Sequence, residues 1–205
     1  MPHPPKALIF DCDGTLILSA ELHYQAFSAA FAAQGHQLDR DFYFARTGLS
    51  RRALLASWIE FTGKTPNSNQ LVDDSVRLAK ILALAGQFRT NSDIVDLARA
   101  WGPRPSAVAS NGEAGLVLAM LKTAGIDSLF DTVVTIDQVG VPKPDPAMFL
   151  LAAARLEVSP VDCLVLEDSA QGLEAAERAG MAAIDIRAPQ SLSRIEALLA
   201  CSAIQ

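Results

Sequence analysis

Short apolar runs alternate with longer amphipathic segments from about residue 89 to the end of the chain. Apolar runs of this length are expected for strands that are covered on both faces. The segments between them are rich in Ala, Leu, Glu and Arg, and two are followed by Gly125 and Gly180, which suit helix C-caps. The predicted strands are 105–109, 131–136, 163–166 and 182–186, and the predicted helices are 113–124, 147–156 and 171–179. This alternation predicts an α/β fold with a parallel sheet.

A further apolar run, residues 7–10, predicts a strand near the N-terminus, but no second strand follows it soon. Instead, residues 17–88 carry helical patterns almost throughout. The clearest of these patterns cover 21–34, 51–61 and 70–84. Because the stretch is too long for one crossover helix, we predict that it is an inserted helical cap. The core is then discontinuous and consists of residues 1–16 and 89–205.

Composition excludes several classes of function. The chain has 205 residues, half of them hydrophobic, and its net charge of −6 lacks the basic excess that favours nucleic acids and anionic membranes. No apolar run approaches the ~18 residues of a membrane span, and proline-rich residues 1–6 do not form a secretory signal. Cys12, Cys163 and Cys201 show neither C-x-x-C spacing nor a disulfide framework. We therefore expect a cytoplasmic monomer with no nucleic-acid or membrane partner.

Two acids follow directly on the N-terminal strand, in Asp11-Cys12-Asp13-Gly14-Thr15. Side-chain alternation places Asp11 and Asp13 on one side, at the carboxyl end of the strand, where parallel α/β sheets build their sites. Two carboxylates so close together repel each other unless a cation or a shared proton relieves them. An ordinary Asp-Gly turn accounts for Gly14 but not for the paired acids. The pair therefore predicts a charged site.

Two further loops place polar groups after predicted strands. Ser110 begins a Ser-Asn-Gly turn before a helix, so its hydroxyl and the nearby N–H groups suit a phosphate, although the same turn is an ordinary N-cap. Lys143 lies among prolines in residues 141–146, which stiffen the loop. A lone lysine in a loop is more often a solvated charge. Taken singly, neither loop identifies a site.

A second pair of acids, Glu167 and Asp168, ends the apolar strand at 163–166. A helix N-cap accounts for Asp168, but Glu167 at the end of a buried strand is costly without a partner. Four strand ends thus supply two acids, a hydroxyl, a lysine and two more acids, in that order. We predict that they meet at one edge of the sheet.

Together these motifs resemble the haloacid dehalogenase-like hydrolase superfamily, in the branch of β-phosphoglucomutase and small sugar phosphatases. The resemblance covers essentially the whole chain. It rests on Asp11-Cys12-Asp13-Gly14-Thr15, Ser110-Asn111-Gly112, Lys143-Pro144-Asp145-Pro146 and Leu166-Glu167-Asp168-Ser169. It implies a Rossmann-like parallel sheet flanked by helices, with a small all-helical cap. It also implies a phosphomonoester as the substrate.

The resemblance implies roles for the four acids. Asp11 attacks the substrate phosphorus and forms an aspartyl-phosphate, while Asp13 protonates the leaving group and then activates water. Mg²⁺ is held by the Asp11 carboxylate, the Asp13 backbone carbonyl and Asp168, with Glu167 helping through water. Asp13 also argues against a dehalogenase, because expelling halide needs no proton donor.

The resemblance also implies that the remaining motif residues bind the phosphoryl group and the substrate. Lys143 and the ion are then expected to neutralise the transferring phosphoryl group, and Ser110 with nearby amides to position it. The expected substrate-binding residues are Thr15, His23, Arg51, Lys80, Asn111 and Gly112. In similar enzymes the hinge histidine contacts the acid/base aspartate, although His23 equally fits the start of a helix face. Arg51 suits a second phosphate or a sugar hydroxyl, with Lys80 as a second clamp, although the cap arginines equally fit a solvated surface.

Three stretches look most like bacterial fructose-1-phosphate or 6-phosphogluconate phosphatases, namely 58–60, 100–105 and 181–187. A Mg²⁺-dependent sugar-phosphate phosphatase is therefore the leading interpretation. One alternative is a β-phosphoglucomutase-type isomerase, which would return the phosphoryl group to another hydroxyl and needs a cap that holds a bisphosphate. A second alternative is an idle phosphate-binding or regulatory protein, which the intact acids and Lys143 disfavour.

Overall fold

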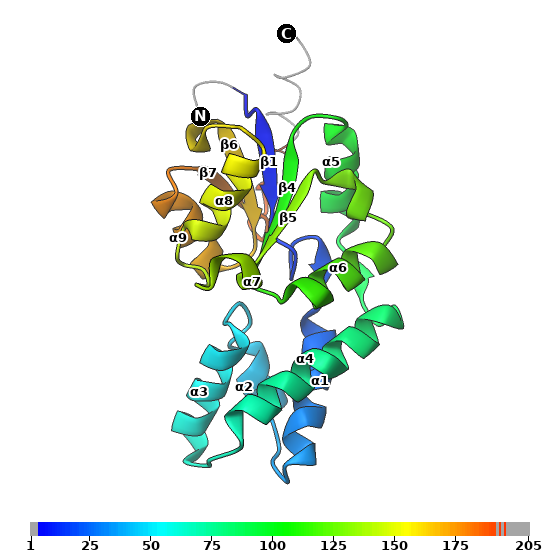
Figure 1. Ribbon diagram of the computed structural model, residues 1–205, viewed down its shortest axis with the longest axis vertical. Coiled ribbons are helices and arrows are strands. Elements are labelled where there is room, and N and C mark those ends of the chain that lie inside the picture. The colour runs from blue at the N-terminus through cyan, green and yellow to red at the C-terminus, as the bar shows by residue number, and fades with distance from the viewer. Residues whose placement is uncertain (1–3, 192, 194, 196–205) are drawn as a thin grey trace.

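The structure is a computed structural model that describes residues 4–191, 193 and 195. A parallel sheet in the order β5-β4-β1-β6-β7 forms the centre of the core, and a helical cap lies below it in Figure 1. Its strands are β1 (Ala7–Phe10), β4 (Ser106–Ser110), β5 (Thr132–Thr135), β6 (Cys163–Glu167) and β7 (Ala182–Asp185). The α/β prediction is confirmed, and every predicted strand is present with its bounds within one residue.

Helices cover both faces of the sheet. The core helices are α5 (Ser92–Trp101), α6 (Ala114–Thr123), α7 (Ile136–Val139), α8 (Ala147–Arg155) and α9 (Ala170–Arg178), with 3₁₀ turns η1 (Asp127–Leu129) and η2 (Pro160–Asp162). In β1, Leu8 and Phe10 join the apolar cluster with α5 and α6, whereas Ala7 and Ile9 join the cluster with α8 and α9. Strict alternation therefore buries the strand on both sides, which is why it is apolar at every position.

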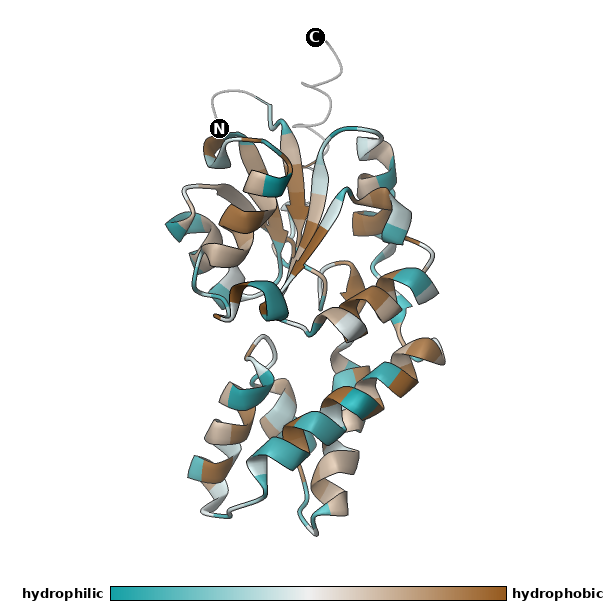
Figure 2. Cartoon of the chain, in the orientation of Figure 1, coloured by the Kyte–Doolittle hydropathy of each residue, from teal (hydrophilic) through white to brown (hydrophobic). Residues whose placement is uncertain are grey.

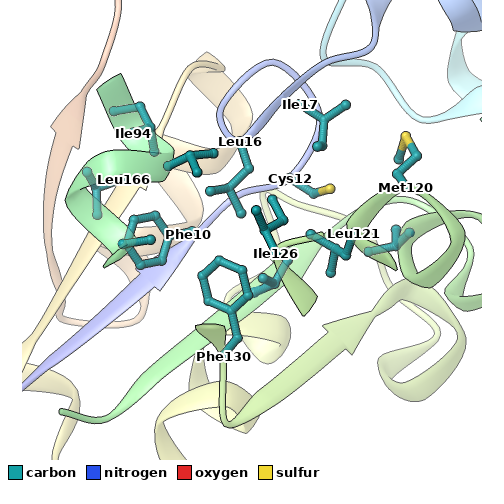
Figure 3. Close-up of a cluster of buried hydrophobic side chains, with 14 of the residues drawn as sticks. Phe10, Cys12, Leu16, Ile17, Ile94, Met120, Leu121, Ile126, Phe130 and Leu166 are labelled. Atoms are coloured by element: carbon teal, nitrogen blue, oxygen red, sulfur yellow. The ribbon is translucent and has the colours of Figure 1, made fainter. Parts of the chain in front are cut away.

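The cluster of buried apolar side chains on the α5 and α6 face includes residues at the start of the loop that follows β1. Figure 3 shows Phe10, Leu16 and Cys12 in one cluster of apolar side chains. The Phe130 ring packs edge-on against the Phe10 ring, with the two ring centroids 5.5 Å apart. Cys12 and Cys163 are buried free thiols, and Cys201 lies outside the described residues. In Figure 2 hydrophobic colours concentrate on the central strands, while hydrophilic positions are spread along the helices. The loop after β1 is thus held in place by the burial of its own apolar side chains, Cys12 and Leu16.

The cap consists of four helices with an apolar centre of their own. They are α1 (Ala20–Ala33), α2 (Arg40–Phe44), α3 (Arg51–Thr62) and α4 (Ser68–Leu84). Phe31 and Trp58, both buried, lie 4.5 Å apart in that centre. Ser50 and Asn67 accept N-terminal amide hydrogen bonds that start α3 and α4. All four helices fall within the predicted segment 17–88.

The chain enters and leaves the cap through one small antiparallel pair. β2 (Ile17–Leu18) pairs with β3 (Arg89–Thr90), with Ile17 opposite Thr90. Both crossings of the chain between the cap helices and the sheet therefore lie side by side. Among the described residues, no helix combines the length and the apolar character that crossing a membrane requires.

Candidate active site

Three of the predicted strand ends lie side by side at one edge of the sheet. Phe10 is in register with Val108 of β4 and with Leu166 of β6. The next residues along these strands are therefore neighbours, and the Asp11 N–H donates to the Leu166 carbonyl at 3.0 Å. The parallel register thus brings together motifs that are more than 90 residues apart, as in the Ser110–Asp13 contact, which spans 97 positions.

Lys143 enters this edge from the loop before α8. Its ammonium donates to Asp11 Oδ1 and Glu167 Oε1, each at 2.7 Å, and to the Ala109 carbonyl at 2.9 Å. The Lys143 side chain is only 2% exposed, so the lysine is an internal charge and not a solvated one. The side chain of Asn111 fixes the loop by accepting from the Lys143 N–H at 2.9 Å.

Burial and charge set the protonation of this group. Burial alone would lower the pKa of Lys143, but the carboxylates of Asp11 and Glu167 outweigh it and raise that pKa above its ordinary value. Burial raises the pKa of Asp11, Lys143 offsets part of the rise, and the carboxylates of Glu167 and Asp168 add to it. One ammonium thus faces more than one carboxylate, so the site favours a further cation.

Asp11, Glu167 and Asp168 form the acidic cluster whose geometry fits a metal ion. One oxygen from each lies within 4.8 Å of the others. Asp11 Oδ2 is buried and has no hydrogen-bond partner among the described residues, which is costly unless a ligand completes it. Burial, together with Glu167, raises the pKa of Asp168 to about 6. Three close carboxylates with an orphaned oxygen suit a hard divalent cation such as Mg²⁺.

Within the cluster, Glu167 is the least available ligand. Its Oε1 accepts from Lys143, and its Oε2 accepts from the N–H and hydroxyl of Ser169 at 2.6 and 2.9 Å. Gly172 lies so close that a Cβ there would overlap the Glu167 carboxylate. Asp11 and Asp168 therefore offer the freer oxygens, and Glu167 holds the lysine.

Asp13 stands apart from this cluster. Its Oδ1 accepts from the Ser19 hydroxyl at 2.6 Å and lies 2.7 Å from His23 Nε2, while its Oδ2 accepts from the Ser110 hydroxyl at 3.2 Å. Burial alone would raise the pKa of Asp13, but His23, Ser19 and the charge of Arg51 lower it well below the usual carboxyl range. Two acids on one loop therefore have opposite environments, which suits them to different tasks.

The motif residues expected to bind substrate occupy several places. Thr15 is fully buried and donates to Asp168 Oδ1 at 3.4 Å, so it supports the acidic cluster. Gly112 N–H donates to the Ser110 hydroxyl at 2.9 Å, and Gly112 and Asn111 line the cavity above Asp11. Gly14, at φ +96°, lets the chain pass so close to Asp168 that a side chain there would overlap it.

A cavity of about 310 Å³ lies between the core and the cap. The core contributes the acids, Lys143 and the Ser110 turn. The cap contributes both kinds of surface: aromatic and aliphatic side chains such as Phe27, Phe44 and Leu54, and the polar side chains of His23 and Arg51. Burial raises the pKa of Tyr43 above its ordinary value, so its phenol stays neutral. The acids and Lys143 thus lie on the core side, and the apolar part of the lining lies on the cap side beside cap polar groups.

The cap residues expected to bind substrate do not all lie at the cavity. Arg51 and His23 line the cavity, but Lys80 does not. Lys80 is exposed on α4, with its ammonium near Gly115 of α6. The structure therefore brings His23 and Arg51 to Asp13 and leaves Lys80 outside.

Two polar contacts of the site were not expected from the sequence. Ser19 and Glu113 occupy N-cap positions of α1 and α6, yet neither side chain caps its helix. Ser19 instead donates to Asp13, and Glu113 accepts from Arg51 Nε at 3.2 Å. The sequence signal at both positions is that of an ordinary helix start, so it cannot identify these partners.

A carboxylate with an open oxygen, a buried ammonium and a cavity of about 310 Å³ are features that suit a hydrolase of phosphomonoesters. A family model described as a haloacid dehalogenase-like hydrolase matches residues 5–180, and the chain belongs to that family. The chain is 33% identical over 181 residues to the fructose-1-phosphate phosphatase YqaB of Escherichia coli, which covers 88% of this chain and 95% of the relative.

Two further relatives carry related names. Identity to the β-phosphoglucomutase of Bacillus subtilis is 30% over 200 residues, which covers 88% of this chain and 83% of the relative. The crystal structure of CbbY from Rhodobacter sphaeroides with phosphate superimposes with a TM-score of 0.79 at 29% identity, over 88% of this chain and 85% of that one. A variant of that CbbY has also been solved with xylulose-(1,5)bisphosphate.

Proposed function

We propose that the protein is a Mg²⁺-dependent phosphatase that hydrolyses small sugar phosphates through a phosphorylated Asp11. The observation that carries the proposal is the state of the Asp11 carboxylate. Lys143 holds one oxygen at 2.7 Å, and the other oxygen is buried without a hydrogen-bond partner among the described residues. A buried carboxylate left half satisfied at a cavity suits both a cation and a covalent step.

In the first step an Asp11 oxygen attacks the substrate phosphorus and the bond from phosphorus to the leaving oxygen breaks. Lys143 keeps its proton and compensates negative charge on the phosphoryl group, and Ser110 donates to it. The proton on the leaving oxygen comes from Asp13. The negative charge of a bound phosphate beside Asp13 raises the pKa of this carboxyl, so that Asp13 takes up that proton from solvent before the phosphoryl group is transferred.

In the second step Asp13 is a carboxylate again. It takes a proton from a water molecule as the water oxygen attacks phosphorus, and Asp11 leaves as a carboxylate. The low pKa of Asp13, caused by His23, Ser19 and Arg51 against the effect of burial, favours the carboxylate before substrate binds. Asp11 and Asp168 would hold Mg²⁺, which supplies charge neutralisation at the phosphoryl oxygens when bound.

The cavity supports sugar phosphates as the substrate class. Its cap side carries aromatic and aliphatic side chains, which suit the apolar face of a sugar, beside the polar groups of His23 and Arg51, and its volume of about 310 Å³ falls in the range of small-molecule pockets. Fructose 1-phosphate is the substrate in the name of the Escherichia coli relative. Small sugar monophosphates are therefore the first compounds to test.

Water is favoured as the final acceptor because the cap cations are already engaged. Arg51 pairs with Glu113, and Arg46 donates to the Ser57 hydroxyl at 2.9 Å and to the Phe42 carbonyl at 3.1 Å. A mutase needs a free cation to hold the second phosphate of a bisphosphate intermediate. The relatives named for β-phosphoglucomutase and solved with xylulose-(1,5)bisphosphate make this the second activity to assay.

The test is release of inorganic phosphate from sugar phosphates, nucleotides, phosphoglycolate and pyridoxal phosphate, with Mg²⁺ and with EDTA. We expect the highest kcat/KM on a sugar monophosphate, no turnover in EDTA and none by Asp11→Asn. Mass spectrometry of acid-quenched enzyme should locate phosphate on the peptide that carries Asp11. Turnover by Asp11→Asn contradicts the nucleophile, and a preference for nucleotides contradicts the substrate class. Formation of glucose 6-phosphate from β-glucose 1-phosphate would identify a mutase.

A further inference from the structure

The guanidinium of Arg51 contacts residues of α1, of α4 and of the turn before α6, at the boundary between cap and core. Its Nη2 lies 3.1 Å from His23 Nδ1 on α1, and its Nε donates to Glu113 Oε2, ahead of α6, at 3.2 Å. Its Nη1 lies 3.5 Å from the Ser75 hydroxyl on α4. The Arg51 side chain is 11% exposed and lies over the Phe27 ring, 5.3 Å from its centroid. The position of the Arg51 guanidinium is thus set by three polar partners and one aromatic ring.

This arrangement assigns the hydrogen on His23. A guanidinium can only donate, so His23 Nδ1 must accept from Arg51 and carries no hydrogen. The ring hydrogen then lies on Nε2, where it donates to Asp13 Oδ1 at 2.7 Å. Arg51 therefore selects the tautomer that His23 presents to Asp13.

The same contacts select which oxygen of Asp13 exchanges a proton. Oδ1 already accepts from His23 Nε2 and from the Ser19 hydroxyl at 2.6 Å. Only Oδ2 faces the Ser110 turn, where a phosphoryl group would sit, and its one contact there is with the Ser110 hydroxyl at 3.2 Å. The line Arg51–His23–Asp13 thus leaves Oδ2 as the oxygen free for proton transfer.

Glu113 of the core makes the Arg51–His23–Asp13 arrangement depend on the position of the cap. Arg51 and Glu113 are 62 positions apart, one on the cap and one on the core, so their contact exists only when the cap lies over the site. The ion pair also neutralises Arg51 locally, which leaves it poorly suited to a second phosphate. Cap position and acid/base geometry are therefore joined through one side chain.

We propose that Arg51 is a positioning residue for proton transfer at Asp13, acting through His23, and not a ligand of the distal part of the substrate. The inference rests on the proposed phosphatase function. The Asp13 Oδ2 proton passes to the leaving oxygen as the P–O bond breaks and the bond to Asp11 forms. A water proton later returns to Oδ2 as the water oxygen bonds to phosphorus and Asp11 is released. Arg51 and His23 keep their protons throughout.

The test uses phenyl phosphates, which share an aromatic leaving group of differing acidity and lack a second phosphate. We expect Arg51→Met to lower kcat/KM about 10- to 100-fold on phenyl phosphate, because phenolate is a poor leaving group that needs its proton. On 4-nitrophenyl phosphate, which needs little protonation, the loss should be below about threefold, with KM nearly unchanged. Arg52→Met is the matched control, since Arg52 is exposed on the same helix and donates to Asn69.

A double-mutant cycle tests the route through His23. In a His23→Phe background, Arg51→Met should cause no further loss on phenyl phosphate, because the line is already broken. Equal losses on every leaving group with a raised KM, or additive losses in the cycle, would overturn the proposal. If Arg51→Met does not fold, Arg51→Lys, which keeps the charge without the fork, should show the same leaving-group pattern. Absence of Mg²⁺-dependent turnover in the wild type would instead contradict the proposed function.

Discussion

The Lys143 ammonium lies 2.7 Å from Asp11 Oδ1, although the two residues are 132 positions apart. The same nitrogen lies 2.7 Å from Glu167 Oε1, and all three side chains are at most 8% exposed. A single buried cation therefore separates two buried carboxylates. Burying these charges costs desolvation free energy, and their mutual pairing is what offsets that cost in the folded protein.

Replacing Lys143 by Met should damage both stability and turnover. The change leaves Asp11 and Glu167 buried with no cation between them, and breaking a buried pair in this way costs about 3–5 kcal/mol. The phosphoryl group also loses a compensating charge, so kcat should fall at least about 100-fold. Urea unfolding and phosphate release measure the two effects.

Lys6→Met is the matched control for this prediction. Lys6 pairs with Asp162 at 2.8 Å, but its side chain is 68% exposed. An exposed pair contributes less than about 1 kcal/mol, and Lys6 lies outside the cavity, so stability and kcat should change little. Equal stability losses in the two variants would show that burial does not distinguish the pairs.

Much of the core could be predicted from sequence because buried strands and half-buried helices require characteristic patterns of apolar residues. All five strands of the main sheet are apolar runs, and Asp11, Ser110 and Glu167 end three of them. The parallel register then requires these ends to be neighbours. The ends of these strands therefore predict, from the sequence alone, where the candidate site lies.

The parts that the sequence did not reveal depend on contacts between distant segments. Strands β2 and β3 have two residues each, too few for a periodic pattern, and α5 was not among the predicted helices. The bonds of Ser19 to Asp13 and of Glu113 to Arg51 use residues that read as ordinary helix starts. Their role follows only from how the cap docks on the core.

Gly172→Ala should reduce activity without unfolding the protein. Gly172 lies in α9 with ordinary helical backbone, so alanine favours the helix by about 1 kcal/mol. Its Cβ would nevertheless overlap the Glu167 carboxylate, which must move and weaken its hold on Lys143. We expect a loss of about tenfold or more in kcat/KM and a lower melting temperature, because the displaced Glu167 carboxylate is a buried partner of Lys143.

Gly115→Ala provides the control for the helix effect. Gly115 lies at a similar place in α6, and a Cβ there would meet Lys80 Nζ at 3.4 Å, an ordinary contact. This variant should gain helix stability and keep its kcat/KM. A parallel loss of activity in both variants would attribute the effect of Gly172→Ala to the helices and not to Glu167.

Lys80→Ala distinguishes the substrate clamp expected from sequence from the position seen in the structure. Lys80 is exposed and does not line the cavity, so its removal should change KM for a sugar phosphate by less than about twofold. Initial-rate kinetics over a range of substrate concentration measure this. A tenfold rise in KM would show that α4 moves toward the substrate during turnover.

Removal of Mg²⁺ should lower stability in a pH-dependent way that depends on Asp168. Its folded-state pKa of about 6, raised by burial and Glu167, lies above the ordinary 3.8, so ionisation is unfavourable in the folded, metal-free protein. Without metal, the stability contribution of this group is therefore largest below about pH 4 and is lost as pH rises toward 6. Bound Mg²⁺ pairs with the ionised form and should reverse that loss.

Thermal melts with Mg²⁺ and with EDTA at several pH values test this dependence. Mg²⁺ should raise Tm most above about pH 7 and have little effect near pH 5, where protons compete for Asp168. Asp168→Asn should lose most of the Mg²⁺ response, and its EDTA curve should vary less with pH because the titrating group is gone. A Mg²⁺ stabilisation that is equal at all pH values, or intact in Asp168→Asn, would place the ion away from Asp168.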